Sequence, residues 1–120
     1  MQGLQLTADL YRCRCEAQWL QDPGALLAWL QAAVQAVGLA PVAQAFHTHP
    51  AGGSSVSLLM VDAHLCLHAW MPERAVTLDI YVGHAGENRS APARGLMDAV
   101  VRRFQPEWTE QRSLDRGEEE

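Results

Sequence analysis

The segment 76-VTLDIYV-82 alternates apolar and polar side chains without a break, and this pattern constrains the fold more than any other. Strict alternation places every second side chain on one face of a β-strand, so one face of this strand must be buried. The segments 56–60 and 65–70 show the same alternation, and the turn 71–74 predicts a hairpin between the last two strands. The middle of the chain is therefore expected to form an antiparallel sheet.

Two helices are expected to pack on this sheet. The segment 22–39 begins with Asp22, which can cap a helix, and Pro23, which suits a first turn, and Gly38 can end it. The second helix is expected at 91–104. The apolar side chains that recur at helical spacing are Leu26, Leu30, Ala33 and Val37 in the first segment and Leu96, Val100 and Phe104 in the second.

The remaining segments complete an α+β sandwich, with a mainly antiparallel sheet and two helices packed on one face. The other expected strands are 3–11, 40–48 and 107–114, and the loop is 49–55. A chain of 120 residues is long enough for one core, so a single domain is expected over 1–114. Residues 115–120 are expected to form an acidic, solvated tail.

Composition excludes several classes of function. The chain is 48% apolar, carries a formal net charge of −5 and contains no lysine, so a nucleic-acid partner is not expected. No apolar run reaches the roughly 18 residues of a membrane-spanning helix, and the N-terminal segment lacks the pattern of a signal peptide. A globular cytoplasmic protein without membrane contact is the expectation.

Cysteines and histidines do not form a recognisable framework. Cys13, Cys15 and Cys66 are odd in number and lack zinc-ribbon spacing, so small buried thiols are expected. His64 and His68 would be neighbouring ligands on a helix, but on a strand they lie roughly 13 Å apart. No metal site is expected among the five histidines, which are His47, His49, His64, His68 and His84.

Four motifs give the chain a family resemblance. They are 9-DLYRC-13, 46-FHTHPAGGSSV-56, 62-DAHLCLHAWMPE-73 and 79-DIYVGH-84. In order and spacing they resemble the small prokaryotic S-adenosylmethionine decarboxylases, pyruvoyl enzymes of spermidine biosynthesis. The match from Phe46 to His84 runs without a gap. The resemblance implies a sandwich of that family's type and active sites formed between two protomers.

Two positions depart from the family where its chemistry takes place. The family's E-S-H serine attacks its own peptide bond and becomes the pyruvoyl group, which requires an oxygen on Cβ. Ala63 occupies that position and has only a methyl group, so no pyruvoyl cofactor is expected to form. Gly83 occupies the position of the cysteine that donates a proton during turnover. Asp62 replaces the glutamate before the serine.

Other parts of the family's site are retained. Ser55 and His68 match the pair that assists self-processing. Trp70 and His49 match the aromatic clamp for adenine, with a smaller ring at position 49. Glu73 is displaced by one residue from the ribose-binding glutamate, and its role depends on the geometry of the turn. Each residue also has an ordinary structural interpretation: Ser55 in a turn, His68 and Trp70 at the edge of the core, and Glu73 as a solvated charge.

Three hypotheses follow from this mixture. The first is a family member that is not self-processed and is catalytically inactive. It acts as a ligand-binding or regulatory subunit, as a homodimer or as a heterodimer with an active paralogue, and takes an adenine nucleoside as ligand. The alternative is an active decarboxylase with a non-standard site, in which Cys66 is the acid and Ser54, Ser55 or Ser57 is cleaved. The third is an oligomerising module without a ligand.

Overall fold

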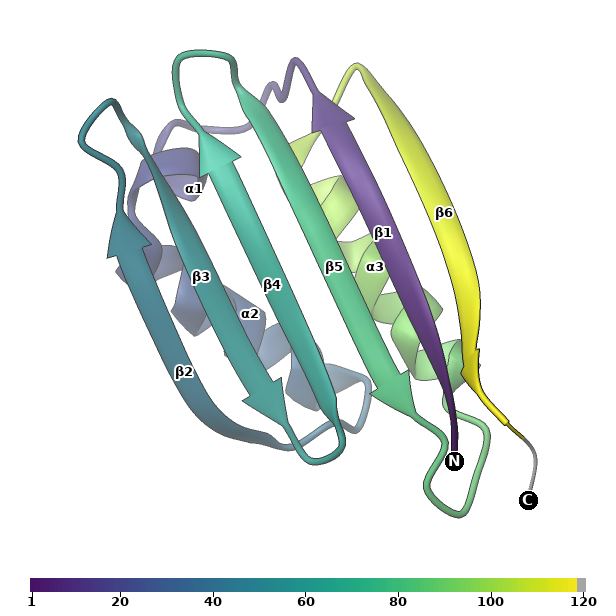
Figure 1. Cartoon of the computed structure of the whole chain (residues 1–120). Helices are drawn as coiled ribbons and strands as arrows, with labels where there is room; N and C mark the ends of the chain where they lie inside the picture. The colour runs from purple at the N-terminus through teal and green to yellow at the C-terminus, as the bar shows by residue number, and fades with distance from the viewer. Residues whose placement is uncertain (119–120) are drawn as a thin grey trace.

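The computed structural model describes residues 1–118 and contains one six-stranded sheet with all its helices on one face (Figure 1). The strands are β1 (Gln2–Tyr11), β2 (Pro41–Thr48), β3 (Gly53–Met60), β4 (Ala63–Trp70), β5 (Ala75–Gly83) and β6 (Trp108–Gly117). The helices are α1 (Gln18–Gln21), α2 (Pro23–Ala36) and α3 (Ser90–Phe104). The strand order is β2-β3-β4-β5-β1-β6, and every neighbouring pair is antiparallel. The predicted α+β fold is confirmed.

The alternation of side chains divides the sheet into two unlike faces. In β4, Ala63, Leu65, Leu67 and Ala69 are buried under the helices. The side chains between them, from His64 to Trp70, lie on the face that carries no helix, which we call the open face. Because the register is antiparallel and in phase, polar residues of neighbouring strands line up in rows across the open face.

Local signals place the two long helices. The Asp22 carboxylate accepts a hydrogen bond from the Ala25 amide (3.2 Å), Pro23 begins α2, and Gly38 follows its end with φ of +84°. The helix α2 contacts β2 and β3, whereas α3 contacts β1 and β5. The buried stripe of α2 differs in part from the prediction, because Leu27 and Val34 are buried and Ala33 and Val37 are only partly covered. The short helix α1 was not predicted.

Two boundaries correct the sequence-based expectations. The loop ends earlier than predicted, because β3 begins at Gly53 and places Ser54 and Ser55 inside a strand. Ser55 is therefore not a turn residue. Likewise β6 continues to Gly117, pairing with β1, so the expected tail does not start at 115. Residues 119–120 of that tail lie outside the described part of the chain.

The two outer strands of the sheet are built differently. The strand β2 begins with Pro41, and its pairing with β3 is irregular between Pro41 and Ala43. The strand β6 contains no proline and pairs with β1 in one continuous register. No helix of the described residues is long and apolar enough to cross a membrane.

Candidate functional site

A hydrogen-bonded chain of three side chains lies on the open face. Ser55 on β3 stands opposite His68 on β4, and its Oγ lies 2.7 Å from the His68 Nδ1. The same Oγ lies 2.7 Å from the Nε2 of His49, in the loop before β3. A hydroxyl has one proton to donate and can also accept, so Ser55 can donate to one ring while it accepts from the other. The arrangement can therefore relay a proton between the two imidazoles.

The loop holds His49 in this position through two glycines. The His49 amide donates to the Gly53 carbonyl (3.0 Å), and the Gly52 amide donates back to the His49 carbonyl (3.0 Å). Gly53 has φ of +124°, and a Cβ at this residue would collide with the carbonyl oxygen of Ala69. Only glycine fits this close approach of loop and strand.

The ring of Trp70 lies beside the hydrogen-bonded side chains of His49, Ser55 and His68. Its side chain is 36% exposed and stacks on His68, with ring centroids 6.0 Å apart and planes 26° apart. The His49 ring is 6.3 Å from Trp70 and tilted by 41°. These rings offer flat apolar surface beside polar nitrogens, which suits a heteroaromatic base. Glu73 is exposed and lines a shallow depression with Trp70 and Ala75, as expected for a turn residue near the ring.

Cys66 lies one row further along the open face. Its Sγ is 3.4 Å from the Ser57 Oγ, and it shares with Ser55 and His68 a hollow of about 270 Å³ next to β2. A second hollow of about 310 Å³ extends from Cys66 and His68 toward Asp79. Ser54, in contrast, is fully buried on the helix side and does not reach either hollow. The structure brings together Ser55, His68, His49, Trp70 and Cys66, with Glu73 beside them.

The positions where the sequence departs from the family's catalytic motifs lie at the opposite end of the sheet. Ala63 begins β4, is 7% exposed and shares the helix-side face of Leu65. The Gly83 amide donates to the Asp62 carbonyl (2.8 Å). A Cβ on Gly83 would lie only 2.5 Å from the Asp62 Cγ, so the Asp62 carboxyl group occupies the space of a side chain at position 83.

The retained and the missing residues do not meet within one chain. Ala63 and His68 are five residues apart on the same strand, which corresponds to roughly 16 Å. We refer to His49, Ser55, His68 and Trp70 as the retained end of the open face, and to Asp62, Ala63 and Gly83 as the altered end of the sheet, where Ala63 faces the helices. The two ends therefore lie apart within one chain.

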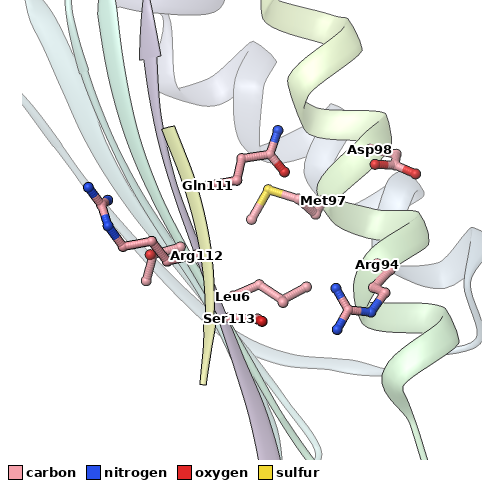
Figure 2. Close-up of a pocket in the computed structure, with 8 residues that line it drawn as sticks. Leu6, Arg94, Met97, Asp98, Gln111, Arg112 and Ser113 are labelled. Carbon is pink, nitrogen blue, oxygen red and sulfur yellow. The ribbon is translucent and has the colours of Figure 1, made fainter. Parts of the chain in front are cut away.

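Sequence reasoning missed two features of the polar surface. Asp79 accepts a hydrogen bond from Gln5 (3.2 Å) and lies 3.9 Å from the His64 Nε2, in the middle of the open face. The alternation in 76–82 placed Asp79 on this face but gave no reason to single it out. The other feature is a hollow of about 260 Å³ on the helix side, between α3 and β6 (Figure 2).

The thiols near the N-terminus are buried as predicted. Cys13 is 1% exposed, and burial raises the pKa of its thiol to about 12, with the neighbouring Cys15 contributing and Arg74 opposing. Burial also raises the pKa of Cys15. Arg74 donates from Nε to the Cys13 carbonyl (2.6 Å) and from Nη2 to the Cys15 carbonyl, so it holds this segment against β5. Within residues 1–118, no group of three or more His, Cys, Asp or Glu side chains could hold a metal ion.

Comparisons with known proteins place this fold and these motifs in one family. A family model described as S-adenosylmethionine decarboxylase matches residues 4–117, nearly the whole chain. The chain belongs to the S-adenosylmethionine decarboxylase family. Within this decarboxylase family, the chain is 25% identical over 116 residues to the S-adenosylmethionine decarboxylase proenzyme of Sulfurihydrogenibium sp. strain YO3AOP1, covering 96% of this chain and 82% of the relative.

Two further decarboxylases are similar. The proenzyme of Persephonella marina is 24% identical over 116 residues, with coverage of 96% of this chain and 82% of that one. The crystal structure of the adenosylmethionine decarboxylase from Aquifex aeolicus superposes with a TM-score of 0.85 at 22% identity, covering 98% of this chain and 92% of that chain. The resemblance seen in the four sequence motifs is thus confirmed for the family and for the decarboxylase fold.

Proposed function

We propose that this decarboxylase-family chain is not self-processed and acts as a partner subunit that supplies the retained end of its sheet to a composite site. One observation carries the proposal. The altered end carries Ala63 and Gly83, which depart from the family's catalytic residues. The retained end carries Ser55, His68 and Trp70, which match the family, and His49, whose ring is smaller than the family's. Substitutions that weakened the site at random would not be expected to separate in this way.

The altered end lacks the atoms that decarboxylation needs. Pyruvoyl formation requires an oxygen on the Cβ of residue 63 as nucleophile and as the group eliminated, and Ala63 has a methyl group. Without a carbonyl there is no electron sink for a carboxylate to leave. Gly83 offers no proton donor, and the carboxyl of Asp62 fills its side-chain space. No pyruvoyl cofactor is proposed for this chain.

The retained end keeps residues that can complete a site shared with another chain. Ser55 and His68 are hydrogen-bonded and face the open side, and Trp70 and His49 offer ring faces for an adenine nucleoside. Two open faces that meet in antiparallel fashion would set the retained end of one protomer over the strand ends that carry Asp62 and Gly83 in the other. In a heterodimer with an intact decarboxylase of the polyamine lineage, one of two composite sites would then have every group.

Complementation between chains tests this role. The partner is an intact, self-processed decarboxylase from the same genome, in which the residue that matches Trp70 is replaced by alanine. We expect the mixture to release carbon dioxide from S-adenosylmethionine. Neither protein should do so alone. The same mixture made with the Trp70→Ala variant of this chain is the matched control and should be inactive. Activity of this chain alone, or an inactive mixture that does associate, would refute the proposal.

The alternative function is decarboxylation at a non-standard site, and the position of Cys66 is the observation in its favour. Cys66 borders the same hollow as Ser55, Ser57 and His68, so a thiol acid and two hydroxyls lie close together. Cleavage at either serine would cut β3 and shorten the polypeptide. Intact-mass spectrometry separates the two functions: one full-length species supports the partner subunit, and two fragments with a borohydride-reducible terminus support the enzyme.

A further inference from the structure

The edge strand β6 is open along its whole outer side. It ends the strand order of the sheet, and among the described residues it pairs with β1 alone, from Trp108 to Gly117, without a register shift. Long, regular edge strands present unpaired amides and carbonyls that can template another strand. The opposite edge is interrupted at one end, since β2 begins with Pro41 and its register with β3 shifts between Pro41 and Ala43. The β6 edge can therefore pair with another strand along its whole length, whereas the β2 edge cannot do so at Pro41.

The open-face side chains of β6 form a self-complementary series. From Trp108 the series continues with Glu110, Arg112 and Leu114. The two apolar members are 50% and 57% exposed, although large apolar side chains are usually covered. Apolar, acidic, basic and apolar residues follow one another at equal spacing. The same series running in the opposite direction therefore sets an apolar residue against each apolar residue and a charge against its opposite.

Only one antiparallel register of two β6 strands sets apolar residues opposite apolar residues and each charge opposite a charge of the other sign. Residues that stand opposite must share a face, so registers differ in steps of two residues. A two-fold axis at Glu110 or at Arg112 sets that residue against its own copy, and like charges repel. An axis at Ser113 sets Leu114 against Arg112. An axis at Gln111 sets Trp108 against Leu114 and Glu110 against Arg112, twice each.

We propose that two copies of this chain pair through β6, antiparallel and centred on Gln111, to form one continuous sheet of six strands from each copy. On the helix side, the same register sets Thr109 opposite Ser113, which are both small polar residues. The hollow between α3 and β6 lies beneath this join (Figure 2). Its polar lining includes Arg94, Asp98 and Gln111.

This interface is separate from the surface used in the proposed function. The retained end belongs to β3, β4 and the loop before β3, and three strands lie between β3 and β6 in the sheet. Pairing through β6 leaves the open face uncovered. The edge interface can therefore be present when the complementation described above fails, and absent when it succeeds.

Charge variants of the full-length chain test the interface. Glu110→Arg and Arg112→Glu each set like charges opposite one another twice, and each should weaken self-association by roughly tenfold or more. An equimolar mixture of the two variants restores opposite charges at both pairs and should form a heterodimer. Arg116→Glu, on the same strand and face but outside the pairs, is the matched control and should self-associate as the wild type does. Sedimentation velocity over a concentration series measures all four samples, and circular dichroism checks that each is folded.

Crosslinking tests the register independently. Gln111→Cys places a thiol on the two-fold axis, so a short bismaleimide should join two copies through residue 111. Thr109→Cys should crosslink poorly with itself and well with Ser113→Cys. A wild-type chain that remains monomeric, single charge variants that dimerise normally, or a mixture that does not associate would overturn the proposal. Loss of association in Arg116→Glu would indicate an axis at Ser113 and would also overturn it.

Discussion

At the scale of single residues, the carboxyl group of Asp62 fills the space that a side chain at position 83 would occupy. Gly83→Ala adds a Cβ that meets the Asp62 carboxyl group, and we expect it to lower stability by about 1–3 kcal/mol. Asp62→Gly removes the carboxyl group and suits the positive φ of 58° at that position, so the double variant should regain most of the loss. Urea unfolding of the four proteins measures the coupling. Additive effects would show that the two side chains do not compete for space.

Cys13 makes stability depend on alkaline pH. Its thiol has a pKa of about 12 in the folded chain and an ordinary value of 9.0 when exposed. Between these values the unfolded chain loses the proton first, so stability is fully present below about pH 9 and falls as the pH rises toward 12. Thermal unfolding should show a steeper decline in this window for the wild type than for Cys13→Ala. Equal slopes would exclude this thiol as the cause.

Trp70 should determine ligand binding at the retained end. Calorimetric titration with S-adenosylmethionine and its decarboxylated form should give weak, reversible binding, because no covalent anchor forms. Trp70→Ala should abolish it, since stacking contributes roughly 0.5–1.5 kcal/mol beyond area burial. Cys66→Ala, on the same strand and face, should change it little. Unchanged binding in Trp70→Ala would place the ligand elsewhere.

At the scale of elements, the loop before β3 connects fold and site. Gly53→Ala should cost roughly 1–3 kcal/mol and release His49 from Ser55, because the added Cβ collides with the Ala69 carbonyl. Gly38→Ala is the control, since Gly38 also has a positive φ but has open space around it. The difference between the two costs, measured by thermal unfolding, isolates the collision. Equal costs would attribute the effect to φ alone.

Elements with strong local signals were predictable, and those defined by packing were not. The alternation in 76–82 and the cap and stop of 22–39 identified β5 and α2, because these patterns reflect burial of one face. The short helix α1 has no capping side-chain hydrogen bond and no acidic first turn, so its sequence carried no signal. The start of β3 was missed because Gly53, Ser54 and Ser55 have the composition of a turn.

The motifs singled out residues that the structure places together, but their arrangement was not predictable. Motif matching identified Ser55, His68, His49 and Trp70, and the sheet brings these together. The alternation of β4 also put Cys66 on their face. The separation of the altered end from the retained end follows from strand register and length, which pair distant parts of the chain. A local sequence pattern does not indicate the distance between the two ends of the sheet.

At the scale of the whole molecule, the sheet offers two surfaces with different consequences. The open face would pair ends of unlike composition and complete a site, whereas the β6 edge would extend the sheet. Both together would give four chains. Glu110→Arg should therefore reduce the size of the assembly while leaving complementation with the decarboxylase partner within about twofold, because rim charges far from a site affect it little. Light scattering and carbon dioxide release measure the two outcomes, and a joint loss of both would contradict their independence.

The carboxyl group of Asp62 in the place of a side chain at position 83 has a consequence for the history of this lineage. A mutation that introduced cysteine at 83 would have to displace the Asp62 carboxyl group, and serine at 63 alone would not supply a side chain at position 83. Cysteine at 83 alone should therefore lower stability, and serine at 63 alone should bring no activity. Selection would favour neither single substitution. Homologues with glycine at 83 should share a short acidic or smaller residue at 62, and their divergence should be one-way.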